Sequence, residues 1–544
     1  LPNAHDDRHD ELRSGAVGKW PRTINAAIGG RVRPKVAVIC NMKAFCFSFV
    51  ILCVAQIALA IPRPDFGING DVANSATTAS AANVLGTEFA KTGAKDITLT
   101  SGYGLLNTLR EKLIAIGDAV ALKGGELATQ LNGLALNDIG PVEDAFGAVN
   151  QKITNLKTYI ESPIQEITDI TNLVSDDIEI QFSDAFDAMK TTITSLNNAL
   201  TKLKTDVNNA KNAPGNGATV SAANIRKFIP AKSVTDVTVQ IRNLRANIPV
   251  ITYIVNSSLE NVELADEFIN EIEAEAIVAV ADYATAVAEF QANLAAENTA
   301  LGNVIADNIG DDVTTRLADI QSELDDSTGY SGSGLSDVLA TINSGITTDL
   351  MAATTAIGGF FTTYSNNVPS LITDLNVELG DALCEPIKAV SEALVANAPY
   401  SDFCFSKYSP RVYAFLALTI DAFDTCFERE VIRLTRLDAI VARIIIQISY
   451  NVEDLFENLS VCLGIEDPEQ SQCFTDIQPY YQALASKITE HEATLEGLVS
   501  KESFASYNRL GSCIATSLFV TVAQGLEVIV DVDTCMEDGP TVTA

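Results

Sequence analysis

Cysteine is the residue type in this chain best placed to form specific covalent chemistry. The chain after residue 60 holds seven cysteines, all of them late, and spacings of ten or more residues with few histidines disfavour zinc, which favours close Cys-x-x-Cys or Cys/His pairs. In an oxidising compartment such cysteines form disulfides. Because seven is odd, one thiol is free or bridges to another molecule. The disulfide candidates are Cys384, Cys404, Cys426, Cys462, Cys473, Cys513 and Cys535.

Residues that could support catalysis are scarce. His491 is the only histidine after residue 60, and it sits in a charged helical pattern where a solvated side chain is expected. A catalytic site needs a nucleophile, a base and an orienting group together, and no such set is visible. The glycines at 102 and 104 lack a third, and those at 329–334 are not followed by Lys, so no phosphate-binding loop is predicted. We expect no enzyme activity, cofactor or metal site.

The segment from Met42 predicts export. Met42-Lys43 precedes an apolar run that ends in small residues at 58–60, the pattern of a signal peptide over 42–60. Residues 1–41 are then expected to be a non-native or annotation-extended leader. The best later apolar run, 439–448, is too short for a bilayer, so we expect a secreted, extracellular protein with no membrane span in the mature chain.

The net charge of the chain limits the classes of molecule that it is expected to bind. The chain has 36 Lys and Arg against 70 Asp and Glu, a formal net charge of −34. A polyanion of this density is repelled by phosphate backbones and anionic leaflets. Nucleic acid is therefore excluded as an expected partner.

Apolar periodicity predicts the elements that carry these residues. Residues 61–100 are small and polar and are expected to be flexible, whereas 101–380 are expected to be helical. Turn clusters at 213–217 and 327–334 separate the helical stretches and predict antiparallel hairpins. The clearest apolar stripe, in steps of three and four, is Phe186, Met189, Ile193, Leu196, Leu200, Leu203 and Val207; a second is Val287, Phe290, Leu294, Leu301 and Val304, with Glu297 in its seam.

Residues 384–535 differ in texture, since they are rich in aromatic side chains and contain the seven cysteines. We expect a disulfide-bearing domain of four or five helices there. The predicted fold is thus all-α: an elongated helical bundle or coiled-coil-like hairpins, followed by a disulfide-stabilised helical domain.

The same last third resembles a known family. Cys404-Phe405-x-x-Tyr408-x-Pro410, followed by the cysteines at 426, 462, 473, 513 and 535, is similar to the cysteine framework of the tsetse EP domain. That family comprises secreted insect proteins of unknown biochemical function. The Glu-Pro repeat behind its name is absent here, with only Glu385-Pro386 present. The resemblance implies an extracellular, insect and possibly midgut setting, and no catalytic residues.

Two sequons could be glycosylated after export, at Asn256 and Asn458. Asn458 lies close to Cys462 on a helical run, so Asn256 is expected to be the better acceptor.

Two functions fit these features. The first is a non-enzymatic extracellular interaction or structural protein, with an unknown protein partner or self-association through the odd cysteine. The alternative is an extracellular carrier of a lipid or other apolar ligand, with the stretch 441–456 lining a pocket.

Overall fold

The structure is a computed structural model that describes residues 64–93, 95–136 and 141–540. The expected leader over 1–41 and the signal peptide over 42–60 lie outside the described residues. Apart from the short antiparallel pair β1 (Pro64–Asp65) and β2 (Ile68–Asn69), the described chain is helical with connecting turns. The all-α prediction is confirmed.

The proximal region, residues 64–266, builds one hydrophobic core from several helices around the first half of α8, and Leu394 and Val395 at the end of α11 also contribute to it. Antiparallel helices α6 and α8 pack together across the turn at 213–217, as predicted, and the whole stripe from Phe186 to Val207 is buried. The elements are α2 (Ser75–Ala90), the 3₁₀ turn η1 (Lys91–Gly93), α3 (Gly104–Leu136), α4 (Val142–Glu161), α5 (Gln165–Leu173), α6 (Asp177–Lys211), α7 (Ala222–Phe228) and α8 (Ala231–Ile305).

The prediction of a flexible segment over 61–100 is wrong for the described residues that form its helix. Its small residues form α2, which packs against both α3 and α8. Small side chains allow this close approach: a Cβ at Gly86 would lie 3.2 Å from the Cβ of Ala128, and one at Gly124 would run into the ring of Phe89. Composition suggested looseness, but Ala and Gly at the contact let the helix backbones approach closely.

The distal region, residues 267–540, consists of long helices that run side by side. At about 1.5 Å per residue, the 75 residues of α8 extend for about 110 Å, and α8 continues through η2 into α9, while α10 continues through η3 into α11. The elements after α8 are the π-helical η2 (Ala306–Val313), α9 (Thr314–Asp325), α10 (Leu335–Ser344), the π-helical η3 (Gly345–Leu350), α11 (Met351–Val395), α12 (Ser401–Leu463) and α13 (Glu469–Asp538).

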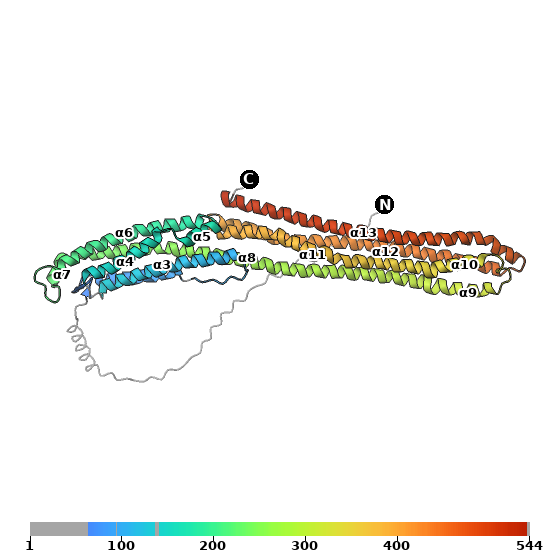
Figure 1. Cartoon of the computed structure of the whole chain (residues 1–544), viewed down its shortest axis with the longest axis horizontal. Helices are drawn as coiled ribbons and strands as arrows, with labels where there is room; N and C mark the ends of the chain where they lie inside the picture. Colours follow the sequence, from blue (N-terminus) through green and yellow to red (C-terminus); the bar gives the residue numbers. More distant parts are fainter. Residues whose placement is uncertain (1–63, 94, 137–140, 541–544) are drawn as a thin grey trace, which may run out of the picture. The chain divides into compact units, whose positions relative to one another are not determined.

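The distal helices share one layered arrangement. Both α8 and α13 pack on α11 and α12, and Figure 1 shows α13, in red, beside α12 along its length. The disulfide-bearing helical character expected over 384–535 is confirmed, but the expected boundary and helix number are wrong: 380–384 falls inside α11, and the six bridged cysteines lie on two long helices rather than four or five. Their core also includes residues of α8, α9 and α10.

Candidate functional site

Three disulfides join α12 to α13 into a pinned hairpin. Cys404 pairs with Cys535, Cys426 with Cys513, and Cys462 with Cys473. Their Cα atoms lie 5.9, 5.9 and 5.7 Å apart, within the usual range for a disulfide. The bridges are nested, so that they hold the hairpin near its open end, along its length and at its tip.

The spacing of the bridges follows from helix geometry. The first two bridges are 22 residues apart on both helices, because residues 404 and 426 on α12 match 535 and 513 on α13. Since 22 residues make about six turns, both cysteines of each helix return to the same side. Two antiparallel helices in constant register can therefore be bridged twice without either helix bending.

Cys384 is the seventh cysteine, and it is free and exposed on α11. It lies one turn before Lys388, whose pKa is raised by a hydrogen bond to Glu385 and by the nearby Cys384 thiol. The odd cysteine count predicts one thiol that is free or bridges to another molecule, and the exposed thiol of Cys384 is accessible for such a bridge.

A buried carboxylate links α12 to α13 between the bridges. Glu430 is 3% exposed, and it accepts hydrogen bonds from Ser506 Oγ at 2.7 Å and from Arg509 Nε and Nη2 at 3.2 and 3.1 Å. Arg433 also contacts it from one turn further along α12. A charge that is buried with this many donors is stable, whereas removal of one partner would leave the others unsatisfied.

Two further buried acids have no such partners. Glu492 on α13 and Asp438 on α12 are each 6% exposed, and one carboxylate oxygen of each, Oε1 and Oδ1, makes no hydrogen bond. Burial, reinforced by the charge of Asp349, raises the pKa of Glu492 to about 7. Burial, reinforced by Glu297, raises the pKa of Asp438 to about 6. These groups titrate near neutral pH rather than near pH 4.

The sequence did carry a signal for these acids. Glu297 was recognised as a polar residue in an apolar seam, and it faces Asp438 in the fold. Glu430 and Glu492 occupy the same kind of position, since each continues an apolar stripe in steps of three and four, but they were not singled out.

The proximal region contains a buried acid of the opposite kind. The carboxylate of Asp266 on α8 accepts the backbone N–H groups of Thr100 and Ser101 at 2.8 and 2.9 Å and the amide of Asn270. Burial alone would raise the pKa of Asp266, but these hydrogen bonds outweigh it and lower the pKa. The carboxylate thereby fixes the loop before α3 against α8.

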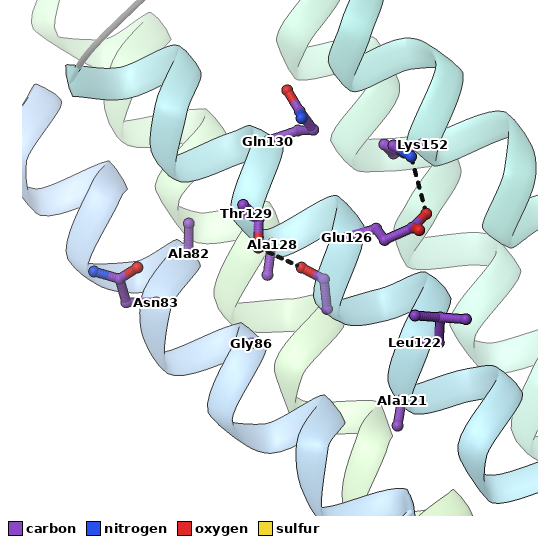
Figure 2. A pocket seen from close by; sticks show the side chains of 11 residues that line it. Ala82, Asn83, Gly86, Ala121, Leu122, Glu126, Ala128, Thr129, Gln130 and Lys152 are labelled. Atoms are coloured by element: carbon purple, nitrogen blue, oxygen red, sulfur yellow. Dashed lines mark hydrogen bonds and ion pairs between the residues drawn. The ribbon is translucent and has the colours of Figure 1, made fainter.

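The described residues carry several open grooves. Figure 2 shows one of about 550 Å³ between α2 and α3, with the ion pair Glu126–Lys152 at 3.0 Å on its rim. Its floor consists largely of small residues such as Ala82, Gly86 and Ala128. Another, of about 690 Å³, lies where α11 and the end of α13 approach α5 and α6.

The stretch 441–456 does not line these grooves. Most of its large apolar side chains, including Val441, Ile445 and Phe456, are buried in the core of the distal region, whereas Tyr450 is exposed. The aromatic and Ile-rich composition that suggested a ligand pocket instead fills the interface between long helices.

Helix α13 is more apolar on its solvent side than a hairpin helix needs to be. Between Arg509 and Asp531 its only charged residue is Glu527. An 18-residue window of this helix has a mean hydropathy of 1.8 with 28% of it buried, so by length and composition it passes a test for a membrane span that core helices of soluble proteins also pass. The run at 439–448 is therefore not the most apolar later one, and the absence of a membrane span stays a prediction.

The two sequons differ in exposure. Asn458 on α12 is exposed, whereas Asn256 on α8 is only partly exposed and its sequon residue Ser258 is buried. The structure therefore reverses the expected order of accessibility. Glycosylation at either position stays a prediction.

The remaining histidine is exposed on α13, as expected for a solvated side chain. Over the described ranges 64–93, 95–136 and 141–540, no group of three or more His, Cys, Asp or Glu is arranged to hold a metal ion. The chemistry that these residues do support is the covalent pinning of α12 to α13.

Two comparisons with known proteins found no similar protein. No family model matches the chain, and a search of curated proteins finds none that is similar to it. The resemblance of the last third to the tsetse EP domain therefore remains a prediction from its cysteine framework.

Proposed function

We propose that this chain is a secreted, non-enzymatic structural or interaction protein of an extracellular fluid. The observation that carries the proposal is the set of three nested disulfides along the α12–α13 hairpin. Structural disulfides form and persist in oxidising compartments and are rare in the cytosol. The expected signal peptide over 42–60 points to the same compartment.

Because the inward side chains of the long helices are used for packing, we expect partners to bind to the exposed helix faces. The residues of the predicted stripes are used for packing, and six of the seven late cysteines are used for bridges. What remains available to partners is a set of extended helix faces together with the exposed thiol of Cys384. A protein of this kind acts by spacing, binding or cross-linking.

The resemblance to the tsetse EP domain supports an insect setting, with the gut lumen as one such fluid. The six cysteines of the resembling framework are the six that form the bridges. We propose that the pinned hairpin is the unit that the resemblance covers.

The alternative is a carrier of a lipid or other apolar ligand. The exposed apolar side of α13 favours it, because such a side could be coated by lipid. Burial of the stretch 441–456 weighs against the specific pocket that the sequence suggested.

Mass spectrometry of the protein secreted from insect cells that express the full chain tests the proposal. We expect an N-terminus at Ile61, three intact disulfides and no bound small molecule. A reductant-sensitive doubling of mass that disappears in Cys384→Ser would identify the thiol as the covalent link. Retention of the chain inside the cell would refute secretion, and an apolar molecule that copurifies and extracts into organic solvent would favour the carrier.

A further inference from the structure

Helix α13 has two apolar sides, and only one of them is packed. Its inner side lies against α11 and α12 and carries the bridged cysteines at 513 and 535. Its other side, here termed the outer face of α13, holds three large exposed side chains: Phe519 is 72%, Leu526 59% and Val530 63% exposed. The outer face consists of Ser512, Thr516, Phe519, Ala523, Leu526 and Val530.

The outer face has the spacing of a coiled-coil seam. Its members follow one another in alternating steps of four and three residues, which places them on one stripe of the helix. Ser512 and Thr516 at its start are small, Leu526 and Val530 at its end are large, and Phe519 and Ala523 at its centre are one large and one small residue. A seam of this kind is complementary to a copy of itself that runs in the opposite direction.

We propose that the outer face of α13 binds the outer face of a second copy of this chain, antiparallel about a two-fold axis beside residue 521. In that register every large side chain meets a small one, and the interface is isologous, as in most homodimers. The layers pair Val530 with Ser512, Leu526 with Thr516, and Phe519 with Ala523 of the other copy.

Charge favours the same direction. Glu527 is exposed beside the seam, and in the antiparallel register it meets Ala515 of the other copy. Parallel pairing in register would place Glu527 of one copy against Glu527 of the other. It would also place large side chains against large ones and small side chains against small ones. Like charges at such short range are destabilising, so the parallel arrangement is disfavoured.

The area fits a weak, specific dimer. Symmetric overlap about residue 521 can extend from Phe504 to Asp538, and at about 1.5 Å per residue and a width of about 10 Å this is roughly 500 Å² on each copy. A total of roughly 1,000 Å² is near the lower limit for a specific interface. With a net charge of −34 on each chain, repulsion opposes association, so we expect the dimer to tighten as salt rises.

A bilayer is a poorer occupant. The bridges at Cys513 and Cys535 hold the inner side of α13 against α12, so only one side of the helix is available to lipid. The outer face also lacks the basic border that helps a helix bind an anionic membrane surface. A second copy needs neither release of α13 nor a basic border.

Sedimentation of the secreted full chain tests this inference, which rests on the proposed interaction function and specifies its partner. All variants carry Cys384→Ser, so that only non-covalent association is measured. We expect a monomer–dimer equilibrium in the micromolar range that tightens between 50 and 500 mM NaCl, on the order expected for so small an interface. Phe519→Ala should weaken it about tenfold or more, as loss of a central aromatic anchor does.

Matched variants separate self-pairing from lipid binding. Ala523→Phe should weaken the dimer, because it places two rings in one layer, whereas Phe519→Ala combined with Ala523→Phe should restore it. Tyr480→Ala removes an equally exposed aromatic side chain of α13 away from the seam and should leave the dimer unchanged. If Ala523→Phe instead increases binding to phosphatidylcholine vesicles while the chain stays monomeric, the outer face binds lipid and the proposal is wrong.

Cross-linking tests the register directly. Under oxidising conditions, Ser512→Cys alone and Val530→Cys alone should stay monomeric on a non-reducing gel, whereas a mixture of the two should give a disulfide-linked heterodimer. Self-cross-linking of either single variant would overturn the antiparallel register. A chain that is secreted and free of ligand but monomeric at 100 µM would refute the pairing and leave the proposed secretion and non-enzymatic role standing.

Discussion

The proximal and distal regions are held together in different ways. In the proximal region, several separate helices enclose the first half of α8 from several directions, and the described residues there contain no disulfide. In the distal region, long helices run side by side, and the hairpin at its edge is bridged three times. Apolar side chains that are packed from many directions can stabilise a region without disulfides. A helix that is packed on one side only is stabilised further by disulfides to its neighbour.

Buried acids show the same contrast. Asp266 in the proximal region is ionised among hydrogen-bond donors, whereas Glu492 and Asp438 in the distal region are buried opposite other carboxylates. The two regions should therefore respond to pH with opposite signs.

Loss of the long-range bridges should have the largest effect. The Cys426–Cys513 bridge closes 87 residues and the Cys462–Cys473 bridge 11, so their replacement by Ser pairs should cost about 4.5 and about 3 kcal/mol by loop-closure entropy. Hydrogen exchange of α12 and α13 measures both losses. Protection in α6 should change little, and Cys384→Ser is the control; equal loss in α6 would show that the two regions unfold as one.

Loss of the buried carboxylate should come next. Glu430→Ala leaves Arg509 and Ser506 without their buried partner and should destabilise the distal region by about 3–5 kcal/mol. Glu502→Ala removes the more exposed partner of the same Arg509 and should cost under about 1 kcal/mol. Urea unfolding measures the free energy of unfolding of both variants. Similar decreases for the two would contradict the greater importance of the buried Glu430.

The response to pH sharpens the comparison. The pKa of Glu492 rises on folding from an ordinary 4.5 to about 7, so distal stability should be highest near pH 4.5 and fall by about 3 kcal/mol as pH rises through 7. Glu492→Gln should flatten that fall. Urea midpoints of the distal region at pH 5 and 7.5 measure it, and an unchanged slope in the variant would assign the effect to other groups.

Asp266 provides the opposite sign within the same chain. Its pKa is lowered on folding, so its contribution is present above its ordinary pKa of 3.8 and is lost as pH falls through the folded value. The hydrogen-exchange protection factors of the loop at 95–103, which correct for the pH dependence of the intrinsic exchange rate, should fall on acidification, and Asp266→Asn should remove that dependence.

Substitution of two neighbouring glycines should have the smallest effect on stability. Gly124→Ala should destabilise the proximal region by about 1–3 kcal/mol, because its Cβ would meet the ring of Phe89. Gly125→Ala has open space around its Cβ and should stabilise α3 by up to about 1 kcal/mol. Thermal unfolding decides between them, and the same sign for both would contradict the close packing of α2 on α3.

Periodicity predicted much of this fold, and composition misled where it was used alone. The stripe from Phe186 to Val207 and the turns at 213–217 and 327–334 were recognisable because core helices repeat every three to four residues. The segment that forms α2 was not recognisable from the sequence, because Ala, Ser and Thr occur both in flexible segments and in closely packed helices. The boundary at 384 failed because a change of texture along α11 marks a change of neighbours rather than an end of the helix.

The cysteines were found from the sequence, but their pairing was not. Any six of them allow 15 connectivities, and the choice depends on the antiparallel register of α12 and α13. The buried acids and the outer face of α13 needed the fold as well, because a carboxylate or a leucine in a helix has the same letter whether or not another helix covers it.

The nesting of the bridges also determines how the protein responds to a protease. A single cut anywhere between Cys404 and Cys535 leaves both products joined by at least one disulfide. Such a cut in the connection between α12 and α13 would be invisible on a non-reducing gel, and the hairpin would keep all three bridges. Release of a fragment from this part of the chain requires two cuts, which gives it a tolerance for nicking that an unbridged helix of the proximal region does not have.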